Sequence, residues 1–335
     1  MNWGIIGLGH MAKNFANSLK ELDNSNLTGV SSRSLIKLIK FGYRFKINPK
    51  FLYKNYEKLL LSKDIDNIYI GTLNHTHFDL IKKCIDAKKN ILCEKPFTIN
   101  LSQALEIKKK LSDSKNFFLE GIAYRSHPQI KHVIKIINEG QIGKILSIKS
   151  SFGFDSGKPN KKGRLFNKDL GGGAILDIGC YPVSMSNLIA NLNQTKETIP
   201  TVSDIKSKTF ETGVDTEVNA KLEYDNGIIS EIKISIIKNL DNITIIEGTE
   251  GAIKILDPWL PKKENIIEIH KKNEIKKLKI SSKLGLFANQ INLFEKFAND
   301  KTQQNNFYAM SLENSVNCLN VMMQLKEKIN KNKNN

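Results

Sequence analysis

Apolar and polar positions follow two different patterns along this chain. In the first third, short apolar runs alternate with stretches in which apolar residues recur at helical spacing. The runs that predict buried strands are residues 3–9, 27–33, 67–73, 90–95 and 117–123. The helical stretches are residues 11–22, 34–45, 77–89 and 102–114, with a shorter one within 51–61. Strands that alternate with helices predict a doubly wound parallel sheet.

The pattern changes after about residue 125. One helical stretch at 130–138 leads into a series of strands without helices between them. Residues 217–236 form two such strands around an Asp-Asn-Gly triplet that suits a hairpin turn, and 264–280 predicts a second hairpin. Helices return at 286–299 and 310–329. This order predicts a mainly antiparallel sheet in a separate part of the chain.

The length of 335 residues suits two domains. We therefore predict an α/β protein with a doubly wound parallel domain at 1–122. Residues 123–335 are expected to form an α+β domain on a large, mainly antiparallel open sheet that binds substrate and forms oligomers. The helix at 310–329 is expected to pack near the domain junction.

Composition excludes several other classes of protein. Apolar residues make up 40% and charged residues 25%, as in ordinary globular proteins. No stretch approaches the roughly 20 apolar residues of a membrane span, and the N-terminus lacks the layout of a signal peptide. The four cysteines form no C-x-x-C pair, so we predict neither a metal site nor disulfides. Reduced thiols predict a cytoplasmic protein.

The formal net charge of +17 raises the question of nucleic-acid binding. The lysines are spread along the chain, often beside asparagine and isoleucine, and form only short clusters such as 107–110. No RNA-recognition, zinc-finger or basic-zipper signature accompanies them. A general compositional bias explains the charge more simply, so no nucleic-acid partner is predicted.

A glycine turn follows the first strand. The segment Gly7-Leu8-Gly9-His10-Met11-Ala12 matches G-x-G-x-x-A between a strand and a helix. The first glycine permits the tight turn, the second lets the backbone approach a pyrophosphate, and the alanine keeps helix and strand close. The helix N-terminus then faces the phosphates. The motif predicts a dinucleotide site; the alternative is a glycine turn that serves packing only.

The end of the second strand distinguishes the two nicotinamide cofactors. NAD sites usually place Asp or Glu there, on the ribose 2′-hydroxyl. This chain has Ser31-Ser32-Arg33-Ser34 and no acid. Hydroxyls and a guanidinium suit a 2′-phosphate, so Ser32 and Arg33 predict NADP. If Arg33 is only a solvated surface residue, NAD remains possible.

Polar residues also follow the next expected strand. Thr72, Asn74 and His77 lie where the chain leaves that strand and enters a helix, so they should border the carboxyl ends of the sheet. Asn74 suits the ribose or the nicotinamide region. His77 is a candidate for the same site, although a residue that caps its own helical turn is an equally good interpretation.

A triple glycine opens the segment GGGAILDIGCYPV at 171–183. Three glycines allow close backbone approach to a ligand, and Asp177 and Tyr181 are spaced to share one helical face. The alternative is a glycine-rich loop before an N-terminal aspartate that the helix dipole favours. Pro182 either kinks this helix or starts a second segment.

The motifs WGIIGLGHMA, TLNHTH, CEKP and GGGAILDIGCY together resemble the Gfo/Idh/MocA oxidoreductases, named for glucose–fructose oxidoreductase and inositol dehydrogenase. The resemblance covers the whole chain and implies an N-terminal Rossmann domain. Tyrosine in DIGCY, and EGIAYRSHPQ at 120–129, are most similar to the branch of dimeric dihydrodiol dehydrogenases and NADP-linked aldose dehydrogenases.

The resemblance implies roles for the triplet Glu94-Lys95-Pro96. The lysine would lie beside the nicotinamide and the carbinol or carbonyl of the substrate. The proline commonly follows a cis peptide bond, which would set the direction of the lysine. Glu94 would help to fix the nicotinamide end and balance the charge of Lys95.

The implied reaction transfers a hydride between nicotinamide C4 and a carbinol carbon. Tyr181 would transfer the proton, since an adjacent Lys95 ammonium favours the phenolate, and the roles of these two residues are interchangeable. Asp177 would hold a substrate hydroxyl or orient Lys95. Arg125 and His127 either bind substrate or have a structural role, and Arg164 is a weaker substrate candidate.

Three alternatives remain open from the sequence. The substrate is a sugar or related polyol, or else a sugar nucleotide or cyclitol. A non-catalytic NADP-binding sensor is the alternative from another class, although Lys95, Asp177 and Tyr181 argue against it. Finally, an uncovered sheet in the second domain should have an apolar outer face, which predicts a homo-oligomer, either a dimer or a tetramer.

Overall fold

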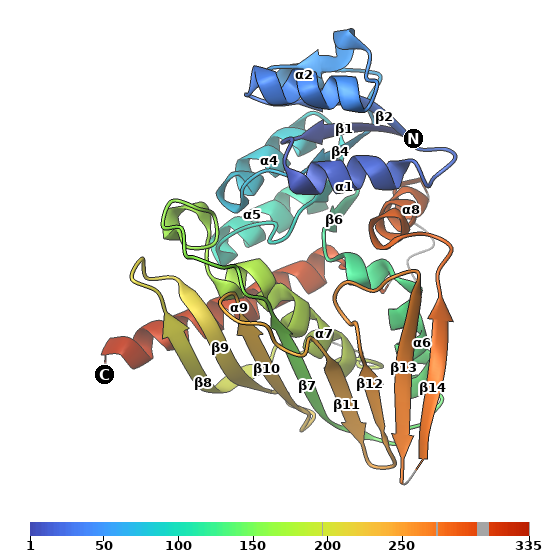
Figure 1. Cartoon of the computed structure of the whole chain (residues 1–335), viewed down its shortest axis with the longest axis vertical. Helices are drawn as coiled ribbons and strands as arrows, with labels where there is room; N and C mark the ends of the chain where they lie inside the picture. The colour runs from blue at the N-terminus through green and yellow to red at the C-terminus, as the bar shows by residue number, and fades with distance from the viewer. Residues whose placement is uncertain (196, 273, 300–307, 335) are drawn as a thin grey trace. The chain divides into compact units, whose positions relative to one another are not determined.

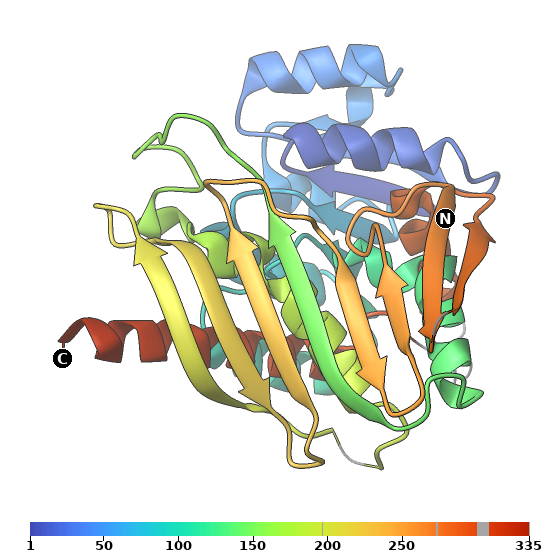
Figure 2. The same ribbon diagram turned by 60° about the horizontal axis from the view of Figure 1, so that its bottom comes forward.

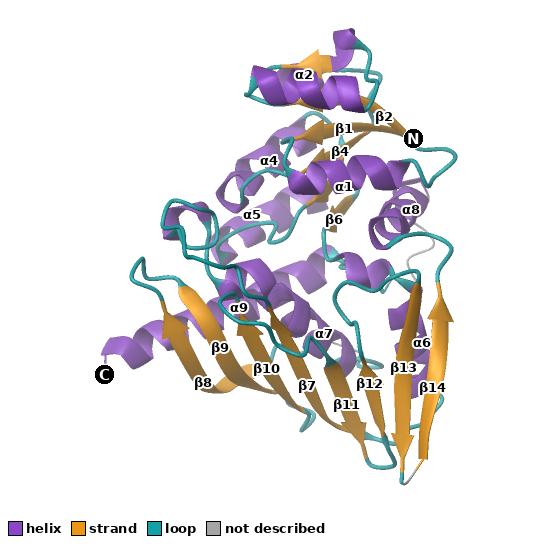
Figure 3. Ribbon diagram, in the orientation of Figure 1, coloured by secondary structure: helices purple, strands orange, loops and turns teal. Residues whose placement is uncertain are grey.

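A computed structural model describes residues 1–195, 197–272, 274–299 and 308–334 (Figures 1 and 3). The chain forms two compact units. The first comprises Met1–Thr98, Ser102–Ser126 and Leu284–Glu313, and the second comprises Ile99–Leu101, His127–Lys283 and Asn314–Asn335.

The first unit is built on a six-stranded sheet. Its strands are β1 (Asn2–Ile6), β2 (Asn26–Ser31), β3 (Leu52–Tyr53), β4 (Asn67–Ile70), β5 (Asn90–Cys93) and β6 (Phe118–Glu120). They pair in parallel in the order β3-β2-β1-β4-β5-β6, which confirms the predicted doubly wound sheet. The order reverses between β1 and β4, and such sheets bind ligands outside the carboxyl ends of the strands at that point.

Helices surround this sheet, and one of them comes from the far end of the chain. They are α1 (His10–Leu19), α2 (Leu35–Arg44), α3 (Tyr56–Leu60), α4 (His77–Asp86), α5 (Leu101–Ser112) and α8 (Leu286–Asn299). In α8, the Phe294 ring lies 4.8 Å from that of Trp3, and Trp3 Nε1 donates to Glu295 at 2.7 Å. The boundary expected at residue 122 assigned α8 to the second domain, whereas it packs into the core of the first unit. Helical spacing marks an apolar face but does not identify its partner.

The second unit is built on an eight-stranded sheet. Its strands are β7 (Ile145–Gly153), β8 (Thr201–Thr209), β9 (Asp215–Glu223), β10 (Ile229–Ser235), β11 (Thr244–Gly248), β12 (Ala252–Ile255), β13 (Glu264–Lys271) and β14 (Glu274–Ser281). The strands lie in the order β14-β13-β12-β11-β7-β10-β9-β8. Among these described strands β7 and β10 pair in parallel, and the other neighbours are antiparallel. The predicted mainly antiparallel sheet and both predicted hairpins are confirmed.

Three helices cover one face of this sheet, as Figure 2 shows. They are α6 (Pro128–Asn138), α7 (Cys180–Ala190) and α9 (Leu312–Asn334). The hydroxyl groups of Ser186 in α7 and Ser230 in β10 lie 2.7 Å apart, and Lys328 of α9 donates to Val202 O at 2.5 Å. Helices and strands therefore share polar contacts as well as an apolar core.

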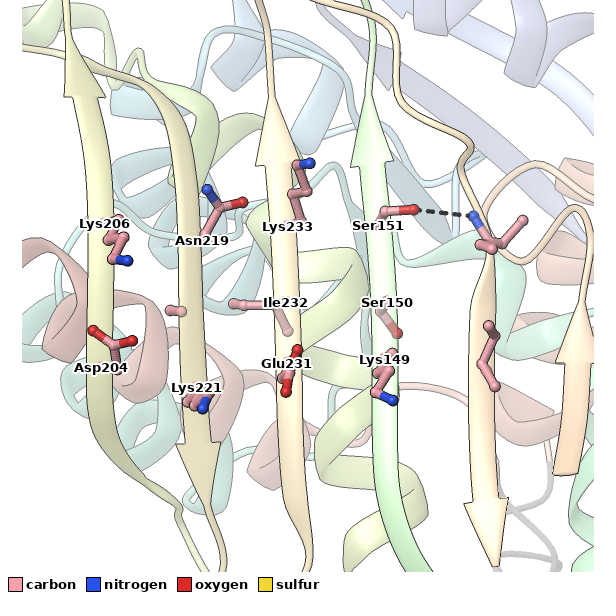
Figure 4. Close-up of a pocket in the computed structure, with 13 residues that line it drawn as sticks. Lys149, Ser150, Ser151, Asp204, Lys206, Asn219, Lys221, Glu231, Ile232 and Lys233 are labelled. Carbon is pink, nitrogen blue, oxygen red and sulfur yellow. Dashed lines mark hydrogen bonds between the residues drawn. The ribbon is translucent and has the colours of Figure 1, made fainter. Parts of the chain in front are cut away.

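The opposite face of the sheet carries a row of charged residues over β8, β9, β10 and β7, which corrects our expectation of an apolar outer face, although Ile243 and Ile245 also line it. Strand register places Asp204, Lys221, Glu231 and Lys149 in one row across β8, β9, β10 and β7. All four are exposed, and Figure 4 shows the shallow hollow that they border. The isoleucines that alternate with them point to the helix-covered face, because successive strand residues face opposite sides.

Candidate cofactor and substrate sites

The glycine turn predicted for a dinucleotide follows β1 in the first unit. Gly7 has a φ of +90°, and a Cβ there would lie 2.6 Å from Thr72 Cγ2 and 2.9 Å from Gly71 O. This position therefore requires glycine. A Cβ at Gly9, in contrast, would have its nearest neighbour, Gly71 O, at 3.9 Å, so open space lies beside it. That space suits a phosphate group drawn close to the backbone.

The first turn of α1 borders the same space. Gly9 is its N-cap residue, and no side chain in the described part of the chain caps the helix. The backbone amides of His10 and Met11 belong to the first turn, whose amides lack partners within the helix. Ala12 is fully buried, as close packing of helix on strand requires. These groups fit a pyrophosphate, which the positive end of a helix favours.

The carboxyl end of β2 carries the residues predicted to select NADP. Ser32 is nearly buried, and its hydroxyl accepts a hydrogen bond from Ser34 N–H at 3.2 Å. Arg33 is exposed, with its guanidinium 5.9 Å from the centroid of the Tyr56 ring. The ring packs against a guanidinium that remains accessible to a ligand.

His77 is fully buried, which favours its structural interpretation over a contact with the cofactor. Its Nδ1 lies 2.8 Å from Pro96 O, and its Nε2 lies 3.3 Å from Thr72 O. Burial lowers the pKa of His77 to about 4, although both carbonyl groups oppose that shift. The neutral ring carries one hydrogen and both nitrogens face a carbonyl, so the shorter contact favours Nδ1 as the donor, to Pro96 O. His77 therefore joins the loops after β4 and β5 instead of contacting a ligand, while Asn74 beside it is half-buried.

The segment Glu94-Lys95-Pro96 after β5 is held by contacts on several sides. Tyr69 of β4 donates its hydroxyl to Glu94 Oε1 at 2.6 Å, and the Lys95–Pro96 peptide bond is cis, as expected. The buried Glu120, at the end of β6, accepts from Phe97 N–H at 3.0 Å. Together with His77, these contacts hold the Glu94 side chain before Lys95 and the backbone after it. Tyr69 and Glu120 were not predicted, because pairing between strands brings them here.

Arg125 is buried, which favours the structural one of its two predicted roles. Its Nε donates to Tyr308 O at 2.6 Å, and its side chain is 2% exposed. It therefore joins the end of the β6 loop to the chain segment after α8. His127, the other residue considered there, caps α6 by accepting from Gln129 N–H at 3.2 Å and is fully buried. These contacts favour the structural role over substrate binding for both residues.

In the second unit, Asp177 lies in a short π-helix, Ile175–Gly179, directly before α7. Pro182, in the first turn of α7, has no amide hydrogen to donate to a carbonyl one turn earlier, and the wider π turn precedes this position. Asp177 is 4% exposed, and Arg164 Nη1 donates to its Oδ1 at 2.6 Å. Arg164, the weaker substrate candidate, thus pairs with a carboxylate of this chain.

Tyr181, at the start of α7, is half-buried in an aromatic corner. Its ring centroid lies 5.1 Å from that of Phe152 and 6.1 Å from that of Trp259, both in edge-to-face geometry. Trp259 in turn donates its Nε1–H to Ser151 O at 2.8 Å. These contacts restrict the direction of the phenol group. The sequence offered one signal for Trp259, as one of only two tryptophans.

The predicted site residues thus fall into two groups. The glycine turn, Thr72 and Lys95 belong to the first unit, and Arg164, Asp177 and Tyr181 belong to the second. No described helix is long and apolar enough to cross a membrane. Within the same described residues, no group of three or more His, Cys, Asp or Glu is arranged to hold a metal ion.

A parallel sheet with a glycine turn at its switch point defines a dinucleotide-binding protein. Residues 1–121 match the oxidoreductase family with an NAD-binding Rossmann fold, and residues 130–254 match the GFO/IDH/MocA C-terminal domain. The chain belongs to the Gfo/Idh/MocA family and is an NAD(P)-dependent oxidoreductase, as its motifs predicted.

Relatives and solved structures agree with this assignment. A trans-1,2-dihydrobenzene-1,2-diol dehydrogenase from Xenopus tropicalis is 32% identical over 262 residues, which cover 77% of this chain and 76% of that protein. The Homo sapiens protein of that name is 29% identical over 264 residues, covering 78% and 76%. In fold, the chain is similar to KijD10, a 3-ketoreductase from Actinomadura kijaniata in complex with NADP and TDP-benzene (21% identity, TM-score 0.85, 98% and 97% covered). It is equally similar to an aldose-aldose oxidoreductase from Caulobacter crescentus complexed with glycerol (19% identity, TM-score 0.85, 98% of each covered).

Proposed function

We propose that this chain is an NADP-dependent dehydrogenase that oxidises a hydroxyl group of a vicinal diol, sugar or related polyol. The names of its relatives support this substrate class. The observation that carries the proposal is the segment around Lys95. Three buried side chains, from β4, α4 and β6, bind the Glu94 carboxylate, Pro96 O and Phe97 N–H. A binding module has no need to fix a lysine in this way.

The cofactor preference rests on the end of β2. No carboxylate stands there to accept from a ribose 2′-hydroxyl, whereas Arg33 is exposed and Ser32 lies beside it. A 2′-phosphate would gain a charge-assisted hydrogen bond from the guanidinium. Arg33→Ala should therefore weaken NADPH binding by at least about tenfold and leave NADH binding unchanged, as measured by fluorescence titration. Equal losses for both cofactors would contradict the assignment.

In the proposed reaction, the nicotinamide supplies the hydride acceptor. Tyr181 takes the hydroxyl proton, and Lys95 donates a hydrogen bond to the oxygen as its carbon becomes a carbonyl. Asp177 accepts from a neighbouring substrate hydroxyl, with its charge balanced by Arg164. Vicinal hydroxyls, one reacting and one held, are the feature that diols and sugars share. An exchange of roles between Lys95 and Tyr181 gives the same overall reaction.

The test is absorbance at 340 nm with purified protein, NADP or NAD, and a panel of trans-diols, aldoses, cyclitols and sugar nucleotides. Turnover of a diol or aldose, lost in Lys95→Ala and Tyr181→Phe, would support the proposal. The matched controls are Lys54→Ala and Tyr43→Phe, because both residues are exposed in the first unit. Turnover confined to sugar nucleotides or cyclitols would change the substrate. NADPH binding without turnover on any substrate would favour the sensor.

We also propose that the protein is cytoplasmic and forms a homodimer through the outer face of its eight-stranded sheet. Its four cysteines are buried thiols, as is usual in a reducing compartment. In the row of Asp204, Lys221, Glu231 and Lys149 the charges alternate, so two copies related by a twofold axis can place acids opposite lysines. The support is thus charge complementarity instead of apolar area. Light scattering should give a dimer that Glu231→Lys dissociates; a monomeric wild type would contradict this.

A further inference from the structure

A carboxylate outside all the sequence motifs holds the segment that carries Asp177 and Tyr181. Asp215, the first residue of β9, is 5% exposed, and its Oδ2 accepts from Ile175 N–H at 2.6 Å. Ile175 begins the π-helix, whose own N-cap residue offers no side-chain acceptor. The carboxylate therefore caps this segment from a distant strand, and its negative charge suits the positive end of the helix.

The other oxygen of Asp215 lies against the triple glycine. A Cβ at Gly173 would lie 2.6 Å from Asp215 Oδ1, and the φ of Gly173 is +107°, so only glycine admits the carboxylate here. Gly173 N–H donates to Leu165 O at 2.9 Å, next to Arg164. Gly173 O accepts from Asp177 N–H at 3.0 Å. The position of Gly173 therefore affects the backbone at Asp177 directly and the backbone at Arg164 through Leu165.

Lys326 of α9 supplies a positive charge beside this carboxylate. It is half-buried and borders the same small hollow as Asp215, Lys168 and Gly172. Burial lowers the pKa of Lys326, and the charge of Asp215 opposes that shift. A buried carboxylate is stable only when charges or hydrogen bonds compensate it, and Lys326 and Ile175 N–H both do so.

We propose that Asp215 is a positioning residue for the reaction. Through Ile175 and Gly173 it sets the direction in which Asp177 and Tyr181 meet the substrate, and Lys326 keeps it in place. The inference rests on the proposed function, which assigns Asp177 and Tyr181 to the substrate. A catalytic group displaced by about 1 Å costs on the order of 10²-fold in rate. Asp215 therefore controls kcat and leaves cofactor affinity unchanged, because the dinucleotide motif belongs to the first unit.

The test compares two substitutions of Asp215 with a matched control. Asp215→Ala removes the acceptor, whereas Asp215→Asn keeps an oxygen for Ile175 N–H. Glu223→Ala removes an exposed carboxylate from the other end of β9. We expect kcat to fall by about 10²-fold in Asp215→Ala, with the Kd for NADPH unchanged. The kcat of Asp215→Asn should lie within about fivefold of the wild-type value. The kcat of Glu223→Ala should equal the wild-type value.

Hydrogen exchange at residues 171–181 provides a readout without turnover. Exchange should accelerate in Asp215→Ala and stay close to wild type in Asp215→Asn. Unchanged exchange, unchanged kcat, or an Asn variant as impaired as the Ala variant would each overturn the proposal. If Asp215→Ala does not fold, Lys326→Met takes its place in the test. We expect kcat to fall in Lys326→Met, by less than in Asp215→Ala. An unchanged kcat would overturn the proposal. A wild type without turnover on any substrate would contradict the proposed function, and exchange would still decide the role of Asp215.

Discussion

His77 should make the stability of the first unit depend on pH below neutrality. The ring is fully buried between the loops after β4 and β5, where burial lowers its pKa from 6.5 to about 4. The unfolded chain therefore binds a proton more tightly than the folded one. The stabilising contribution is complete above pH 6.5 and is lost as the pH falls from there towards 4.

The size of this effect follows from the two pKa values. One unit of pKa difference corresponds to about 1.4 kcal/mol. The free energy of unfolding therefore falls by about 3 kcal/mol once the pH is low enough to protonate His77 in both the folded and the unfolded protein. At pH 5 the unfolded state is largely protonated and the folded state is not, and the loss is about 2 kcal/mol. A loss of this size is a large fraction of the stability of a typical domain.

The assay is urea unfolding at pH 7.5 and pH 5, followed by the fluorescence of Trp3 in a Trp259→Phe background. Trp3 is buried in the first unit, so its signal reports that unit alone. His77→Asn is the reference variant, because its amide can still donate to Pro96 O but does not titrate. The difference between the two proteins removes the contribution of His127, whose pKa burial also lowers to about 4.

We expect the free energy of unfolding to fall by about 2 kcal/mol more in the His77 protein than in His77→Asn between the two pH values. An equal fall in both proteins would refute the reasoning, since it would mean that the folded ring accepts a proton as readily as the unfolded one. A larger fall in His77→Asn would refute it as well.

Three further predictions concern the glycine turn and the buried Arg125. Gly7→Ala should lower the free energy of unfolding by at least about 1–2 kcal/mol, because its φ is left-handed and its Cβ would collide with Thr72. Gly9→Ala should leave stability unchanged but weaken NADPH binding by about tenfold or more, by fluorescence titration; normal binding would exclude pyrophosphate from that space. Arg125→Met should cost about 1.5–3 kcal/mol in urea unfolding with kcat/KM kept within about twofold, because a charged buried hydrogen bond is lost. A raised KM with unchanged stability would instead restore its role as a substrate ligand.

Much of the fold was accessible from local patterns. Uniformly apolar runs predicted the parallel strands, because strands buried on both faces need no polar side. The glycine turn was recognisable since Gly7 has a left-handed φ that favours glycine and Gly9 leaves open space beside the backbone. Even the charged outer face was present in the pattern: in β10, Glu231 and Lys233 alternate with Ile232 and Ile234. We expected an apolar face from the architecture and overlooked this alternation.

Distant contacts decided the rest. Lysine, histidine and arginine have the same sequence signal whether they face a ligand or a backbone carbonyl, and only the fold showed that His77 and Arg125 are buried on carbonyl groups. The residues that α8 packs against are remote from it in sequence, and so is the carboxylate that caps the π-helix. The sequence therefore determined the periodicity, the turns and the candidate chemistry of this protein, because these depend on neighbouring residues. Tertiary structure alone decided which polar groups meet, because the burial and pairing of a side chain depend on segments that are remote in sequence.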